Sequence, residues 1–362
     1  MEDKLKIVMT ADTVGGVWTY ALDLCKALMS YNVEVHLVTM GALLNEKQSI
    51  DVNKLSNTHV YQSNYKLEWT QGASSDMGLA KKWIASICLE VDPDIIHFNN
   101  YNQSPGSWKC PVITVYHSCE QTCWRAVKGS HASSEWNEHS QTVKEALITS
   151  DIVVAPTKSI LKEAEAIYGK LPNSEVIYNG RNINRPFGEQ QKEPIILSAG
   201  RVWDEAKNIQ LLSSIAREVE WPIWVAGNNS KTFRTGSTGL DTINFLDLLS
   251  PDVLQQWMDQ SAIFIMPAKY EPFGLAILEA AQSSCVLVLS NLDTLKEIWG
   301  DAALYFDPFK EEQAKDLLNE LANNDELRHE MAKRAYKRAS EFTAESMAYN
   351  YMRLYKKLLV VA

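Results

Sequence analysis

Two basic side chains in the second half of the chain have the residue types of a phosphate site. Arg201 and Lys207 flank a short loop that follows an apolar run and opens a helical pattern. Both cations could reach one diphosphate, with arginine acting as a planar fork and lysine as a point charge. An exposed ion pair between Arg201 and Asp204 or Glu205 explains the same spacing, and spacing alone does not separate the two interpretations.

The segment from Glu271 to Glu279 is the most specific pattern in the sequence. Pro272 and Gly274 lead into a helix start, where main-chain amides suit a phosphate. Glu271 precedes this helix and Glu279 lies two turns along it, so each carboxylate could accept from hydroxyls of a ligand at the helix end. An amphipathic helix with two surface glutamates would explain neither the Pro-Phe-Gly sequence nor the charge-free stretch that follows it.

Two loops of the first half also place candidate groups after apolar runs. Gly15 and Gly16 precede a helical pattern, where paired glycines let the main chain approach an anion closely. A tight turn explains them equally well, and the full dinucleotide fingerprint Gly-x-Gly-x-x-Gly is absent. His117 directly follows an apolar run, and its imidazole could donate to a substrate hydroxyl, although a structural hydrogen bond is the commoner role of such a residue.

Alternating strand and helix patterns must position these groups. In the first half the expected strands are 6–9, 33–39, 95–98, 112–116, 152–155 and 175–178, and the expected helices are 18–30, 81–90, 138–149 and 158–168. In the second half the expected strands are 194–199, 223–226, 243–245, 263–266 and 286–289, and the expected helices are 208–218, 252–260 and 274–283. The pattern predicts an α/β protein of two doubly wound parallel sheets, which bind ligands outside the carboxyl ends of their strands.

A polar stretch around Pro186 interrupts the alternation and is typical of a linker. We therefore expect a first domain over residues 1–186 and a second over residues 187–342. The chain is almost purely helical toward its end, and residues 343–362 are expected to form a C-terminal helix.

The composition excludes several classes of protein. The chain has 362 residues, 46% of them hydrophobic, and 35 Lys and Arg against 45 Asp and Glu give a net charge of −10. This balance argues against a nucleic-acid binder, whose surface should be basic. The sequence contains neither a signal-peptide pattern nor an apolar run long enough to span a membrane, and six cysteines are too few for a disulfide framework. We expect a cytoplasmic protein.

These motifs resemble those of a known family, the retaining, nucleotide-sugar-dependent glycosyltransferases of family 4, which have the GT-B fold. The resemblance rests on paired glycines after the first strand, on Gly200-Arg201 with Lys207, on the E-x7-E pattern from Glu271 to Glu279, and on residues 176–180. It implies two Rossmann-like domains that face a central cleft, the first for the acceptor and the second for the donor. It also implies a last helix that crosses back onto the first domain.

The resemblance implies a role for each matching residue. Arg201 and Lys207 would hold the donor diphosphate, Glu279 the ribose, and Glu271 and His117 the donor sugar. The catalytic set is then His117, Arg201, Lys207 and Glu271. The donor set is Gly15, Gly16, Arg201, Lys207, Phe245, Leu246, Glu271, Phe273, Gly274, Leu275 and Glu279.

The expected reaction is transfer of a sugar from a nucleoside diphosphate to a hydroxyl of a saccharide or small molecule. The family resemblance implies retention by front-face attack. Because no D-x-D motif follows an apolar strand, we expect no metal and no cofactor. Asp12 is a weak candidate for a carboxylate nucleophile. The alternatives are another GT-B enzyme, such as an epimerase or a phosphorylase, and a non-catalytic protein that binds nucleotide sugars.

The acceptor is expected on the first domain, where aromatic and polar side chains are interleaved. The candidates are Asp12, Trp108, Trp124, Arg125 and Trp136, accompanied by Lys128, Glu135 and Glu138. Aromatic faces with hydrogen-bonding neighbours suit a sugar, but core packing explains the tryptophans as well. An amphipathic pattern over 351–361 would suit a membrane surface, whereas packing on the protein itself explains the same pattern and is our prediction.

Overall fold

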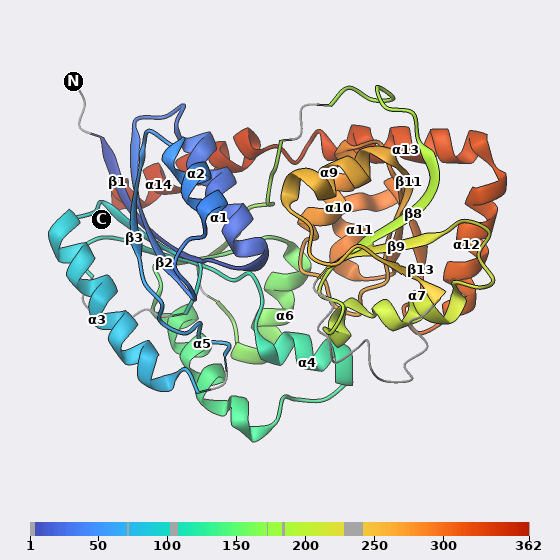
Figure 1. Ribbon diagram of the computed structural model, residues 1–362. Coiled ribbons are helices and arrows are strands. Elements are labelled where there is room, and N and C mark those ends of the chain that lie inside the picture. Colours follow the sequence, from blue (N-terminus) through green and yellow to red (C-terminus); the bar gives the residue numbers. More distant parts are fainter. Residues whose placement is uncertain are drawn as a thin grey trace. The chain divides into compact units, whose positions relative to one another are not determined.

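The computed structural model describes residues 4–70, 72–101, 108–171, 173–182, 185–227 and 242–361. The chain divides into two compact units (Figure 1). Unit 1 consists of Met1–Gly180 together with Ala344–Ala362, and unit 2 consists of Arg181–Thr343. The predicted division into an acceptor domain and a donor domain at residue 186 stays a prediction.

The sheet of unit 1 is entirely parallel, with the strand order β3-β2-β1-β4-β5-β6-β7 over the described residues. Its strands are β1 (Leu5–Asp12), β2 (Val33–Met40), β3 (Thr58–Gln62), β4 (Ile95–Phe98), β5 (Val112–Val115), β6 (Ile152–Ala155) and β7 (Ser174–Val176). The chain adds β2 and β3 on one side of β1 and then moves to β4 on the other side. The strand order therefore reverses between β1 and β4, which is where open α/β sheets bind ligands.

Helices cover the sheet of unit 1, so its central strands are buried on both faces and their sequences are almost continuously apolar. The helices are α1 (Gly15–Leu28), α2 (Glu46–Asn53), α3 (Ser74–Val91), α4 (Glu120–Lys128), η1 (Ser134–Trp136), α5 (Asn137–Thr149), α6 (Lys158–Tyr168) and α14 (Ala344–Val361). One core cluster joins Val8, Ile96 and Phe98 of the strands to Ile84 and Ile87 of α3.

Helix α14 closes unit 1, although it comes last in the sequence. Tyr20 of α1 donates to the hydroxyl of Tyr351 at 2.6 Å, and Nδ1 of His97 on β4 lies 2.8 Å from the hydroxyl of Tyr355. Tyr351 and Tyr355 of α14 are fully buried. The implied return of the last helix to the first unit is thereby confirmed.

The sheet of unit 2 is also parallel, and its described strands follow the order β10-β9-β8-β11-β12-β13. The strands are β8 (Glu193–Ala199), β9 (Ile223–Ala226), β10 (Asn244–Phe245), β11 (Ser261–Met266), β12 (Val286–Ser290) and β13 (Leu304–Phe306). The helices are η2 (Glu205–Lys207), α7 (Ile209–Ile215), α9 (Pro251–Gln260), α10 (Leu275–Gln282), α11 (Asp293–Trp299), η4 (Gly300–Ala302), α12 (Glu311–Asn323) and α13 (Asp325–Ala339). In this sheet the strand order reverses between β8 and β11.

The predicted fold class of two doubly wound parallel sheets is confirmed. The first strand runs three residues beyond its expected end, to Asp12, and α1 begins at Gly15, so the loop between them is shorter than predicted. Within the described part of the chain, no helix has the length and apolar character that crossing a membrane requires.

Candidate functional site

The two loops at the switch point of unit 2 meet through an ion pair. Lys207 ends the 3-10 helix that follows β8, and Glu271 stands in the loop after β11. Lys207 Nζ donates to Glu271 Oε2 at 2.6 Å, and both side chains are largely buried. The main chain joins the same loops, because the amide of Lys269 donates to the carbonyl of Ala206 at 2.8 Å. The cation and the carboxylate therefore form one partly desolvated cluster.

Glycines let the main chain pack closely behind this cluster. A Cβ atom at Gly200 would lie 3.4 Å from Lys207 Cγ, so the lysine side chain runs along the glycine. A Cβ atom at Gly227, just after β9, would lie 1.7 Å from the carbonyl oxygen of Gly200. No side chain fits there, and the ends of β8 and β9 can approach only because Gly227 lacks one.

The start of α10 completes the cluster. Gly274 precedes the helix with φ +87°, a left-handed conformation that glycine adopts without strain. A Cβ atom at Gly274 would lie 3.4 Å from Glu271 Cγ. The Thr294 hydroxyl donates to the carbonyl of Glu271 at 2.7 Å and fixes the loop. A helix N-terminus, a lysine and a carboxylate are thus brought together, and the roles predicted for Lys207 and Glu271 stay predictions.

Arg201 adopts the ion pair that the sequence left open as an alternative. Its Nε and one terminal nitrogen donate to Asp204 Oδ2 at 3.0 and 2.6 Å. The side chain is half exposed, and its guanidinium lies 5.4 Å from the centre of the Trp203 ring. An exposed pair of this kind contributes little to stability, about 0–1 kcal/mol, so it can open for an incoming anion.

Glu279 has a basic neighbour that the sequence analysis did not single out. Arg181 Nη1 lies 2.8 Å from Glu279 Oε1, and the Gln282 side chain donates to the carbonyl of Arg181 at 2.6 Å. These contacts hold the Glu279 carboxylate on the first two turns of α10.

The other donor candidates of unit 2 lie in structured positions. Phe245 packs against the core cluster of the sheet, and the Leu246 amide donates to the carbonyl of Val225 at 2.9 Å. Phe273 is buried, and Leu275 is the first residue of α10. These residues shape the loops around the cluster.

Unit 1 places polar side chains at the ends of three adjacent strands. Asp12 ends β1, Asn99 follows β4 and His117 follows β5. Asn99 is fixed by Thr10, because its amide nitrogens donate to the Thr10 hydroxyl and carbonyl, both at 2.9 Å. The carboxyl end of the sheet is therefore polar at the switch point between β1 and β4 and on the neighbouring strand.

The contact with Asn99 determines the tautomer of His117. His117 Nε2 lies 3.0 Å from Asn99 Oδ1, and the Asn99 amide group is already donating to Thr10. Oδ1 can only accept, so Nε2 carries the proton. Burial lowers the pKa of His117 to about 3, so the ring is neutral and its Nδ1 is an acceptor. The sequence suggested a ring that donates to a substrate hydroxyl, whereas the free nitrogen Nδ1 can only accept from one.

Gly15 and Gly16 form the first turn of α1. Gly15 has φ +72° and no neighbour within 4 Å of where a Cβ atom would lie. The preceding turn is fixed by Thr13, whose hydroxyl donates to the Met40 carbonyl at 3.2 Å and accepts from the Ala42 amide at 3.0 Å. The glycine surface is open, as close approach of a ligand requires.

Asp12 belongs to a pair of buried carboxyl groups. Its Oδ2 accepts from Trp69 Nε1 at 3.1 Å, and the Tyr101 amide donates to Glu68 Oε1 at 3.2 Å. Burial raises the pKa of Asp12 to about 6, and burial with the nearby Asp12 charge raises the pKa of Glu68 to about 8. Glu68 is therefore largely protonated at neutral pH.

The predicted acceptor residues separate into different environments. Trp108 packs against Phe98 and the core of unit 1, with ring centres 5.9 Å apart, so it has the core position weighed as an alternative. Trp124 and Arg125 lie on α4, where Arg125 is exposed. Trp136 lines a cavity.

Several residues of these sites were not identified from the sequence. Asn99 had a usable signal, because it follows an apolar strand as His117 does. Gly227 likewise ends a strand. Arg181 and Glu68 had none, since their contacts join residues far apart in sequence. In the described ranges no three His, Cys, Asp or Glu side chains are grouped to hold a metal ion, and metal independence stays a prediction.

Comparisons with known protein families cover most of the chain. Residues 14–185 match the family described as Glycosyltransferase Family 4, and residues 180–338 match Glycosyl transferases group 1. An uncharacterized glycosyltransferase of Methanocaldococcus jannaschii is 23% identical over 323 residues, which cover 79% of each chain. The O-antigen chain mannosyltransferase B of Escherichia coli is 27% identical over 173 residues, 48% of this chain and 40% of that protein.

Solved structures show the same fold. The sucrose-phosphate synthase of Thermosynechococcus elongatus has a TM-score of 0.79 at 15% identity, covering 99% of this chain and 100% of its own. Anabaena HepE, solved with UDP and glucose, has a TM-score of 0.74 at 14% identity and covers 98% of this chain and 100% of its own.

Proposed function

Since the chain belongs to glycosyltransferase family 4, we propose that unit 2 binds the nucleoside diphosphate sugar and unit 1 the hydroxyl compound that receives the sugar. The contact between Lys207 Nζ and Glu271 Oε2 at 2.6 Å carries this proposal. It places a cation beside the helix start at Gly274, in the loops where a doubly wound sheet binds its ligand.

The diphosphate is the group that unit 2 is built to stabilise. Departure of the nucleoside diphosphate builds negative charge on the phosphate, and a nearby cation and the amides of a helix end lower the barrier. Lys207 is already in place. Arg201 joins it by leaving its exposed ion pair with Asp204. The guanidinium can then donate two parallel hydrogen bonds to the phosphate.

The carboxylates of unit 2 accept from hydroxyls of the donor. Glu279, held by Arg181 at 2.8 Å, receives the ribose hydroxyls. Glu271 receives those of the sugar. In unit 1, His117 Nδ1 accepts from a further sugar hydroxyl. Anabaena HepE was solved with UDP and glucose, so a UDP sugar is the first donor to test.

For the reaction we propose retention of the anomeric configuration without a metal. The acceptor hydroxyl oxygen bonds to the anomeric carbon on the face from which the diphosphate departs. The bond between that carbon and the diphosphate oxygen breaks, and a phosphate oxygen of the leaving group takes the hydroxyl proton. Asp12 is a poor nucleophile for a double displacement, because its carboxyl group is buried and Trp69 already donates to Oδ2 at 3.1 Å. A carboxylate nucleophile must be free to attack.

Turnover by Lys207 variants tests this assignment. UDP, GDP and ADP and their sugars are first compared by thermal shift, and release of free nucleoside diphosphate is then measured with the selected donor. Lys207→Met should lower turnover by roughly 100-fold or more, because a preorganised charge at the leaving phosphate is lost. Lys207→Arg should recover part of it.

Lys296→Met is the matched control, because Lys296 is exposed on α11 of the same unit. The control should keep full turnover. Unchanged turnover in Lys207→Met would rule out the proposed diphosphate site. Nucleotide binding without any turnover on a broad set of acceptors would favour the non-catalytic alternative.

A further inference from the structure

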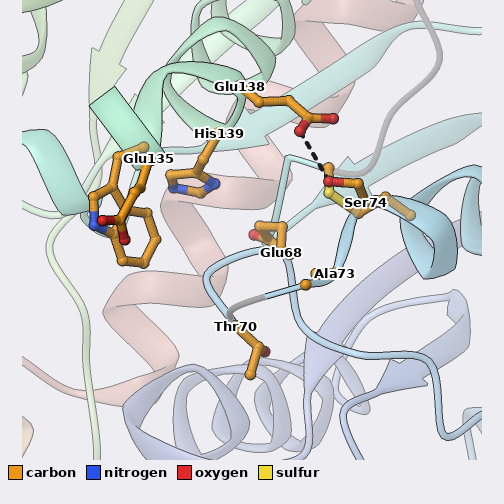
Figure 2. A pocket seen from close by; sticks show the side chains of 10 residues that line it. Glu68, Thr70, Ala73, Ser74, Glu135, Glu138 and His139 are labelled. Carbon is orange, nitrogen blue, oxygen red and sulfur yellow. Dashed lines mark hydrogen bonds between the residues drawn. The ribbon is translucent and has the colours of Figure 1, made fainter. Parts of the chain in front are cut away.

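A cavity lies in unit 1 between two segments distant in sequence. Its empty volume of about 490 Å³ includes space open to solvent. One wall comes from residues 68–70 and 72–77, at and before the start of α3, and the other from η1 and the start of α5. In Figure 2 the His139 ring lies between Glu135 on one side and Ser74 on the other, with Glu68 below it.

The cavity contains a polar atom that lacks a protein partner. His139 is 8% exposed, and its buried Nδ1 has no hydrogen-bond partner among the residues that the structure describes. An imidazole nitrogen left unpaired in this way costs about 1–3 kcal/mol. Burial lowers the pKa of His139 to about 4, so the ring is neutral, with one nitrogen that donates and one that accepts. A ligand hydroxyl, which can both donate and accept, would satisfy Nδ1.

The remaining polar groups of the cavity are acidic or hydroxylic. Glu138 Oε2 accepts from the Ser74 hydroxyl at 2.9 Å across the opening (Figure 2). Glu68 and Glu135 add two further carboxyl groups, and no Lys or Arg is among the described residues that line the cavity. The Trp136 ring contributes an aromatic wall and meets His139 edge to face, with centres 5.8 Å apart.

We propose that this cavity binds one ring of the acceptor, and that the ring carries hydroxyls and a protonated amine, as an amino sugar or an aminocyclitol does. The amine lies near the carboxylates of Glu135 and Glu138, and a hydroxyl forms a hydrogen bond with His139 Nδ1. The ring face packs on Trp136. This inference rests on the proposed assignment of unit 1 to the acceptor.

The charges favour an amine over an anion. A phosphate or carboxylate in the cavity would face Glu135 and Glu138, and like charges at short range repel. No cation is among the described lining residues, and Lys66, outside the lining, donates to the carbonyl of Gly72 at 3.5 Å. Burial raises the pKa of Glu68 to about 8, so this carboxyl group is largely protonated at pH 7. The ionic partners of the amine are therefore Glu135 and Glu138. A protonated amine instead gains charge-assisted hydrogen bonds.

The cavity is connected to the catalytic end of the sheet. Tyr101 donates through its amide to Glu68 at 3.2 Å and through its hydroxyl to the carbonyl of Ser118 at 2.8 Å. Ser118 is the neighbour of His117, and the charge of Asp12 raises the pKa of Glu68. A ring bound here therefore lies beside the groups that end β1 and β5.

Direct binding to the full chain tests the proposal without a donor. Glucosamine, glucose and glucose 6-phosphate are titrated at about pH 6.5 and followed by ligand-observed NMR. Glucosamine should bind at least about fivefold tighter than glucose, and glucose 6-phosphate weakest, as expected for partly exposed charges. Glu138→Gln and Glu135→Gln should each weaken glucosamine about two- to fivefold and leave glucose unchanged.

Glu145→Gln is the control, because Glu145 lies on the same helix two turns beyond Glu138 and does not line the cavity. His139→Phe keeps a ring and should weaken both neutral and amino sugars. Equal binding of the three sugars, or equal losses in the control, overturns the inference. A UDP titration of the same samples is a separate readout of unit 2, so failure of the donor assignment is seen independently.

Discussion

The buried carboxyl groups of Glu68 and Asp12 make the stability of the fold depend on pH. Burial raises the pKa of Glu68 to about 8, with a further contribution from Asp12. A carboxyl group whose pKa is higher in the folded than in the unfolded chain binds more protons when folded. The free energy of unfolding must therefore fall as the pH rises from the unfolded pKa, about 4.3, through 8.

We predict that Glu68→Gln removes this loss. Between about pH 7 and 8 the wild type should lose up to about 1.4 kcal/mol per pH unit from this group, whereas the variant should be nearly flat. Four histidines with lowered pKa values titrate below this window and do not interfere: His36, His97, His117 and His139. Urea unfolding at each pH measures the difference.

Glu90→Gln is the matched control for this experiment, because Glu90 is exposed on α3 of the same unit. Its stability should follow the wild type at every pH. Parallel curves for Glu68→Gln and the wild type would contradict the raised pKa.

At the residue scale, the sequence was enough to select side chains with the right chemistry, but not to predict their hydrogen-bond and ion-pair partners. Lys207 and Glu271 stand out by type and spacing, and both take part in the cluster of unit 2. Arg181 and Asn99 do not stand out in the sequence. Their partners, Glu279 and His117, lie 98 and 18 residues away, and only the fold brings them into contact. Whether a tryptophan is core or contact is likewise decided by tertiary packing, as Trp108 shows.

Helix α10 is the element on which the donor site depends, and its start depends on Gly274. We predict that Gly274→Ala destabilises the protein by about 2–3 kcal/mol. The residue has φ +87°, and its new Cβ atom would lie 2.6 Å from Ile277 Cδ1. Strain and clash act together and should shift the helix end. Nucleotide affinity should fall with stability, as measured by thermal unfolding and by UDP titration.

Gly129→Ala is the comparison for Gly274→Ala. Gly129, at the end of α4 in unit 1, has φ +68° and ψ 12° and no atom within 4 Å of its Cβ position, so only the left-handed backbone strain of about 1 kcal/mol applies. UDP affinity should be unchanged in this variant. Equal effects of the two substitutions would show that the clash at α10 is relieved without cost.

At the element scale, prediction succeeded where the hydrophobic period was strong. Strands β4 and β6 and helix α6 begin and end at the expected residues. Strands β3 and β13 were missed, because the first has polar residues along its length and the second has three residues. Asn208, with φ 53°, shows that a left-handed turn can use asparagine in place of glycine.

The two units repeat one design at the scale of the whole molecule. Each sheet reverses its strand order beside the first strand of its unit, between β1 and β4 and between β8 and β11. The candidate groups of both units follow these strands. The alternation of strand and helix patterns was enough to predict two doubly wound sheets. Parallel strands need helical connections that cover both faces of the sheet. The membership of α14 in unit 1 came from the family resemblance, since local periodicity carries no information on packing partners.

Because α14 completes unit 1, we predict that its contacts stabilise that unit selectively. Tyr351→Phe removes the hydroxyl that accepts from Tyr20 at 2.6 Å and leaves a buried donor with a weaker partner, His97, at 3.4 Å. The expected cost is about 1–3 kcal/mol. Tyr349→Phe, on the same helix but 58% exposed, should cost nothing measurable.

Hydrogen exchange resolved by peptide distinguishes the units in this experiment. Protection should fall in β1, β4 and α1 of the Tyr351→Phe protein and stay unchanged in β8 and β11. Truncation after Thr343 should abolish protection of unit 1, since Tyr351 and Tyr355 are fully buried against it. Equal loss in both units would mean that α14 stabilises the molecule as one cooperative body, and the assignment of the helix to unit 1 would have no energetic basis.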